Sequence, residues 1–175
     1  MLRQFKYTAR FVDDLLTCAN PAFAECLYES HVREDGVRGI YPDFLTLTAE
    51  QDSVRGVSFL DVSIVFDHDR WFTTIYDKRE HPPLSRVNSL KYPHVSCFLS
   101  DRSKYGIITS RLHAFSRVCQ RKCDFIARSR IFLRAFRARG YSAARIRSFV
   151  MRFLKTVAIP YAFRSRHALM RAMMA

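Results

Sequence analysis

The feature that most constrains the fold is a change in the spacing of apolar residues near residue 100. Between residues 57 and 66, successive residues would face opposite sides of a β-strand, which has a period of two. Phe59, Asp61, Ser63 and Val65 would face one side, and the apolar Leu60, Val62, Ile64 and Phe66 the other. After Ser100 the apolar positions recur about every 3.6 residues, as expected for an α-helix. The first such series is Tyr105, Ile108, Leu112, Phe115 and Cys119. The chain is therefore predicted to be an α+β protein with a β-rich front and a helical back.

The β-rich part is predicted to consist of antiparallel hairpins. Residues 5–18 contain two runs of β-forming residues separated by Asp13 and Asp14, which fits two strands joined by a turn. Residues 57–66 and 71–76 predict a second hairpin around the turn residues Asp67-His68-Asp69-Arg70. We also expect a short helix over residues 21–35 and a short strand over residues 41–48.

The helical part is predicted to form a bundle of three short-linked helices. The first covers about residues 103–122, and Asp124 can cap the second, which stops at Gly140. Ser142 can cap the third, which ends before Pro160.

Charge divides at the same place as the apolar period. The chain has 29 Lys and Arg against 16 Asp and Glu, a net charge of +13. Residues 1–100 hold 11 of these cations and 14 of the acids, whereas residues 101–175 hold 18 cations and 2 acids. A solvated helix face would carry acidic partners, but only Asp101 and Asp124 occur there. The second part is therefore predicted to grip a polyanion.

The motif that indicates chemistry is Phe11-Val12-Asp13-Asp14. Flanking apolar residues would hold the two carboxylates at a tight turn. Adjacent carboxylates repel each other, and a divalent cation relieves that repulsion. The alternative is an ordinary acidic hairpin tip.

Together with Leu15-Leu16, this motif resembles the aromatic-x-Asp-Asp box of reverse transcriptases. Further blocks follow in the order of that family, and the resemblance covers about residues 5–155. Phe59-Leu60-Asp61 looks like the strand that leads into the primer-contacting hairpin of non-LTR and Penelope-like retroelements. The blocks lie at residues 41–47, 57–64, 73–79 and 104–112, and the last looks like the first thumb helix of those elements.

The resemblance implies a partial palm of antiparallel β-hairpins followed by an all-α three-helix thumb. The palm would cover residues 1–80, a connection residues 81–100, and the basic thumb residues 101–158. Residues 159–175 form a basic tail that we do not assign.

The resemblance also implies two-metal nucleotidyl transfer, with Mg²⁺ or Mn²⁺ at the catalytic pair Asp13 and Asp14. Asp13 would be the direct metal ligand and Asp14 the looser one. Phe59, Leu60 and Asp61 would lie near the primer terminus, with ordinary strand packing as the alternative for Phe59 and Leu60. An RNA or DNA template–primer duplex would be held at its phosphates by Arg102, Lys104, Arg111, Arg117, Arg121 and Lys122.

In the family, a third metal-binding carboxylate and the fingers precede the aromatic-x-Asp-Asp box. We therefore expect this chain to be the C-terminal palm and thumb portion and inactive alone, with deoxynucleotides as substrates of the full-length enzyme. Whether the chain itself is an enzyme stays open. The alternatives are a non-catalytic basic helical module that binds nucleic acid, and a decayed open reading frame of a mobile element.

The five cysteines are odd in number and irregularly spaced, so no disulfide partner is expected. Cys97, Cys119 and Cys123 could surround zinc with His94, but idle thiols are favoured because a Cys-x-x-Cys spacing is absent. The sequence shows no signal-peptide pattern and no apolar run of the about 18 residues that a membrane span needs. We therefore expect no membrane partner and an intracellular location, either nuclear or cytoplasmic.

Overall fold

The computed structural model describes residues 8–11, 14–17, 23, 41–42, 44–45, 56–82, 84 and 91–175. Most of the helix predicted over residues 21–35 and most of the strand predicted over residues 41–48 lie outside these ranges. The chain divides into two compact units, residues 1–60 and residues 61–175. The described part contains small antiparallel sheets and four α-helices, which confirms the predicted α+β class.

The first unit contains the hairpin predicted over residues 5–18. Strands β1 (Thr8–Phe11) and β2 (Asp14–Thr17) pair antiparallel, with Phe11 opposite Asp14 and Thr8 opposite Thr17. The two threonine hydroxyls are hydrogen-bonded at 2.9 Å, which ties the open end of the hairpin. The register brings Phe11 and Asp14 together at the closed end of the hairpin.

The strand predicted over residues 57–66 is interrupted in the structure. Strand β3 (Gly56–Phe59) ends where Leu60 adopts a left-handed conformation with φ of 55°, and β4 (Val62–Asp67) begins two residues later. Leucine rarely adopts positive φ, so the alternating pattern gave no sign of this break. The continuous strand was therefore a wrong prediction. The turn after it is confirmed: β4 pairs antiparallel with β5 (Arg70–Ile75), with Asp67 opposite Arg70.

The outer edge of β5 is covered by the connection between the first two helices. The Gln120 amide donates to the Thr73 carbonyl at 3.1 Å, and the Thr73 amide donates to the Gln120 side chain at 3.1 Å. The Thr73 hydroxyl donates to the Val118 carbonyl at 2.5 Å. Polar groups of a strand edge are thereby satisfied within the second unit.

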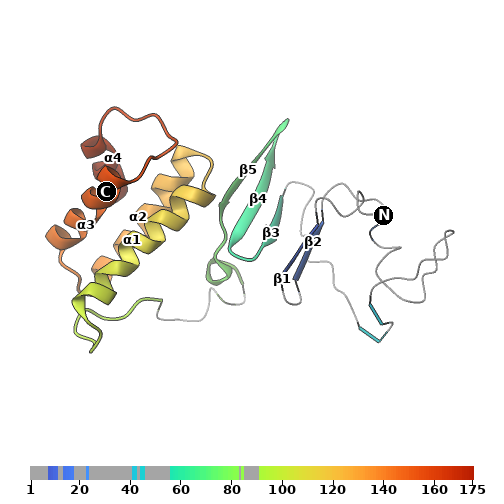
Figure 1. Ribbon diagram of the computed structural model, residues 1–175, viewed down its shortest axis with the longest axis horizontal. Helices are drawn as coiled ribbons and strands as arrows, with labels where there is room; N and C mark the ends of the chain where they lie inside the picture. The colour runs from blue at the N-terminus through green and yellow to red at the C-terminus, as the bar shows by residue number, and fades with distance from the viewer. Residues whose placement is uncertain are drawn as a thin grey trace. The chain divides into compact units, whose positions relative to one another are not determined.

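The predicted helices are present with shifted ends. They are α1 (Asp101–Val118), α2 (Lys122–Ala138) and α3 (Ala143–Thr156), and they pack together with α4 (Arg166–Met174) (Figure 1). Gly140 follows α2 with φ of 85°, which confirms it as the stop of that helix. Asp124 is not the cap of α2, because it lies in the first turn and its carboxylate pairs with Arg121 at 2.7 Å.

Helix α4 lies in the tail that the sequence left unassigned. It buries Leu169, Met170 and Met173 against the other helices. Its last carbonyls are bonded by arginines of α2, with Arg130 donating to Ala172 at 2.9 Å and Arg134 to Ala175 at 2.6 Å. Residues 101–175, called the helical body below, therefore have four α-helices among the described residues, one more than predicted.

The core of the helical body is rich in aromatic rings. Phe125, Phe136 and Phe153 are fully buried, and the Phe125 ring packs against Tyr161 with centroids 5.5 Å apart. Tyr92, which precedes the helices, packs against Phe136 at 4.8 Å. All buried members of this core cluster lie between Tyr92 and Met173, so residues 91–175 contain a hydrophobic core of their own.

Candidate nucleic-acid interface and adjoining pocket

The acidic motif lies on the β1–β2 hairpin. Asp14 is the first residue of β2, is half-buried and stands opposite Phe11. Asp13 and Val12 lie outside the described residues. Among the side chains that the structure describes, no three His, Cys, Asp or Glu gather as metal ligands. Cys97, Cys119 and Cys123 are free thiols.

The three residues predicted to lie near a primer, Phe59, Leu60 and Asp61, differ in secondary structure and surroundings. Phe59 ends β3, and Leu60, 38% exposed, forms the turn that follows. Asp61 is exposed, and its carbonyl accepts from the Tyr76 amide at 2.9 Å. The Asp61 side chain lines a pocket of the second unit.

Both acidic residues of the helical body are already paired with cations. The Asp101 carboxylate accepts from Arg145 at 2.8 Å, and this hydrogen bond lowers the pKa of Asp101. The Asp124 carboxylate accepts from Arg121 at 2.7 and 3.1 Å. Residues 101–175 therefore have no acidic side chain left to neutralise their other cations.

The six predicted phosphate contacts divide into two groups. Lys104 is only 6% exposed and donates to the Val95 carbonyl at 2.6 Å. Arg121 holds Asp124, with its guanidinium 3.4 Å from the centre of the Phe72 ring. Lys122 donates to the Ala162 carbonyl at 2.8 Å. These three cations stabilise the fold, and the uncommitted ones are Arg102, Arg111 and Arg117.

The uncommitted cations of α1 point to different sides of the helix. At about 100° per residue, Arg102 and Arg117 lie about 60° apart around the axis, whereas Arg111 lies about 180° from Arg102. Arg102 and Arg117 are exposed, and Arg111 is half-buried. A duplex laid along the exposed face of α1 would therefore meet Arg102 and Arg117, while Arg111 faces elsewhere.

Sequence reasoning missed several exposed cations on the other helices and their connections. None makes a hydrogen bond or ion pair through its side chain with a described residue. The signal that could have found them is the near absence of acidic residues after residue 100. They are Arg137, Arg147, Arg152, Lys155, Arg164, Arg166 and Arg171.

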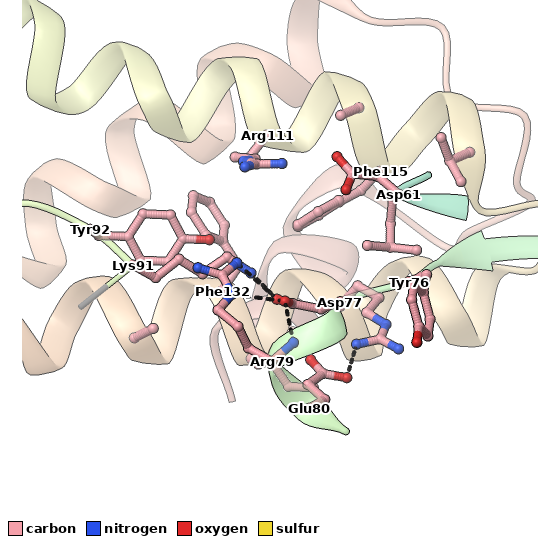
Figure 2. A pocket seen from close by; sticks show the side chains of 16 residues that line it. Asp61, Tyr76, Asp77, Arg79, Glu80, Lys91, Tyr92, Arg111, Phe115 and Phe132 are labelled. Atoms are coloured by element: carbon pink, nitrogen blue, oxygen red, sulfur yellow. Dashed lines mark hydrogen bonds and ion pairs between the residues drawn. The ribbon is translucent and has the colours of Figure 1, made fainter. Parts of the chain in front are cut away.

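Arg111 lines a pocket of about 460 Å³ in the second unit, formed by the end of β5, a short 3-10 helix (Lys78–Glu80), α1 and α2 (Figure 2). Asp77 organises one wall. Its carboxylate accepts from Arg79 at 2.9 and 3.1 Å and pairs with Lys91. Burial opposes its ionisation, but these hydrogen bonds outweigh burial and hold the pKa of Asp77 well below its usual range.

Comparison of this chain with protein-family models, curated proteins and solved structures finds no match. Among the residues that the structure describes, no helix is both long and apolar enough to span a membrane. A function is therefore inferred from the chain's own residues and geometry.

Proposed function

We propose that this chain is the palm and thumb portion of a retroelement reverse transcriptase. It would carry out nucleotidyl transfer at the Phe11-Val12-Asp13-Asp14 hairpin, with the template–primer held by the basic helical body. The observation that carries the proposal is the hairpin register. Because Phe11 pairs with Asp14, the first and last residues of the aromatic-x-Asp-Asp motif lie opposite each other on two antiparallel strands, and the Asp14 carboxylate is carried by β2.

The donor chemistry of the hairpin suits Mg²⁺ or Mn²⁺. Mg²⁺ is commonly bound through one or two carboxylates, with waters and substrate phosphates completing its shell. Asp14, half-buried on β2, would provide one carboxylate, and Asp13, its neighbour in the sequence, would provide the second. When bound, the metal would supply Lewis-acid stabilisation of phosphoryl oxygens.

The helical body supports the proposed grip on nucleic acid. Its two carboxylates are neutralised internally, which leaves Arg102 and Arg117 of α1 and the exposed cations of the other helices for phosphates. Contacts of this kind are independent of base sequence, as a polymerase requires.

A second candidate is a non-catalytic module that binds nucleic acid. The observation that favours it is the self-contained core of residues 91–175, since that part would need no help from the acidic hairpin to present its cations. The two candidates differ in whether Asp13 and Asp14 bind a metal ion.

Metal titration separates the candidates. We predict that the wild-type chain binds Mn²⁺ weakly in calorimetry and that Asp13→Asn and Asp14→Asn each abolish this binding. Asp69→Asn, an exposed carboxylate in the β4–β5 turn, is the matched control and should leave it unchanged. Equal Mn²⁺ binding by wild type and Asp13→Asn would contradict the polymerase proposal. If the Asp13→Asn variant also binds duplex as wild type does, the non-catalytic nucleic-acid-binding module would be favoured.

A further inference from the structure

The pocket beside Asp77 is lined by charged side chains, and not all of them have a bonded partner of opposite charge. Asp77 is held by Arg79 and Lys91, and Glu80 accepts from Arg128 at 2.5 Å. Arg111 and Asp61 line the same pocket, yet neither side chain has a hydrogen bond or ion pair with the described residues. Figure 2 draws the bonds at Asp77 and Glu80 and none at these two.

The side of α1 that carries Arg111 also brings apolar side chains to the pocket. Ala114, Phe115 and Val118 follow Arg111 on the pocket side of α1, at the spacing of one helix face. Ile131, Phe132 and Ala135 line the opposite side from α2. A half-buried cation without a partner loses hydration and gains no hydrogen bond or ion pair in exchange. An anion that fits here would therefore be bound with a strong, charge-assisted hydrogen bond.

Tyr92 adds a second donor near the same place. Tyr92 is 7% exposed, and its hydroxyl points toward the centre of the pocket (Figure 2). Burial raises the pKa of Tyr92 to about 12, although the positive charge of Arg111 opposes that shift. The phenol therefore keeps its proton and can donate to an anion. Asp61 offers the opposite chemistry, an acceptor for hydroxyl or amino groups.

We propose that this pocket binds a nucleoside monophosphate. Arg111 and the Tyr92 hydroxyl hold the phosphate, Asp61 accepts from the sugar hydroxyls, and the base lies along the apolar wall that includes Phe115 and Phe132. A carboxylate that accepts from ribose hydroxyls is a common arrangement in nucleotide sites. The pocket volume of about 460 Å³ lies within the range of small-molecule sites. The assignment does not depend on catalysis at the acidic hairpin.

The test is calorimetric titration of the full chain with adenosine 5′-monophosphate, inorganic phosphate and adenosine. We expect the monophosphate to bind at least about tenfold more tightly than either part alone, since each part makes only some of the contacts. Arg111→Gln should weaken monophosphate binding by about tenfold or more. Asp61→Asn should weaken the monophosphate and adenosine but leave phosphate unchanged.

Arg117→Gln is the matched control, because it makes the same change on the same helix at an exposed position away from the pocket. Its dissociation constant for the monophosphate should equal that of wild type. Tyr92→Phe keeps the buried ring and removes only the hydroxyl, so it tests the site should Arg111→Gln unfold. It should weaken the monophosphate several-fold.

Three results would overturn the inference: no monophosphate binding at millimolar concentration, equal affinity for monophosphate and phosphate, or an unchanged constant in folded Arg111→Gln or Tyr92→Phe. Duplex binding is tested by a separate experiment, with variants of Arg102 and Arg117 on the exposed face of α1. A failure of this site is therefore distinguishable from a failure of the nucleic-acid proposal.

Discussion

Removing the two exposed arginines of α1 should reduce the salt dependence of duplex binding. Arg102 and Arg117 are separated by fifteen positions, about 22 Å along the helix at a rise of about 1.5 Å per residue. That span matches about six base-pair steps of ~3.4 Å, so one duplex can meet both. Each neutralised phosphate contributes about −0.9 to the slope of log binding constant against log salt.

The double variant Arg102→Gln/Arg117→Gln should therefore have a slope smaller in magnitude by about 1.8. Between about 50 and 200 mM salt, wild type should lose about twelvefold more affinity than the variant. The measurement is fluorescence anisotropy of a labelled duplex of about 20 base pairs, titrated at several salt concentrations.

Arg111→Gln serves as the control within α1, because its side chain lies on the opposite side of the helix and lines the pocket. It should leave the slope unchanged. An unchanged slope in the double variant, or an equal decrease in Arg111→Gln, would refute the assignment of the exposed face of α1 to the duplex.

Three further predictions concern the stability of the second unit. Because hydrogen bonds lower the folded-state pKa of Asp77, its contribution is present above the unfolded pKa of about 3.9 and is lost as the pH falls through and below it. Denaturant unfolding of wild type should therefore weaken more steeply between about pH 5 and pH 3 than that of Asp77→Asn. Gly140→Ala should destabilise by at least about 1–2 kcal/mol in the same assay, because Gly140 has φ of 85° and a Cβ there would lie 2.9 Å from Val95 Cγ1. Gly106→Ala, where a Cβ meets nothing within 4 Å, should instead stabilise α1 by up to about 1 kcal/mol.

The helical core was predictable because burial and periodicity coincide there. Ile108, Leu112 and Phe115 recur at helical spacing and are buried in the structure. Helix α4 was not predictable in this way. It has nine residues, and isolated helices of that length are marginal, so its stability depends on packing against α2 and α3 and on carbonyls bonded by Arg130 and Arg134.

The candidate sites were only partly predictable. The β1–β2 hairpin follows from local sequence, since two runs of β-forming residues were predicted as strands on either side of the acidic pair, but Asp14 is the first residue of β2 and not part of the turn. The pocket does not follow from local sequence, because its lining comes from residues as far apart as Asp61 and Ala135. Helical spacing alone could have separated Arg102 from Lys104, which lie two residues and about 200° apart. Whether a lysine on the inner side meets a phosphate or a carbonyl is decided by tertiary packing.

The count of cations after residue 100 overstates the charge that a polyanion can meet. Of the 18 there, eight donate to carbonyls or carboxylates of the chain itself: Lys104, Arg121, Lys122, Arg128, Arg130, Arg134, Arg139 and Arg145. If every one of the remaining ten met a phosphate, the salt slope would reach about −9. A single duplex covers one face, so the slope for this body should be well below that limit. A steeper slope would mean that residues 1–100 also contact the duplex, or that the structural cations leave their partners to do so.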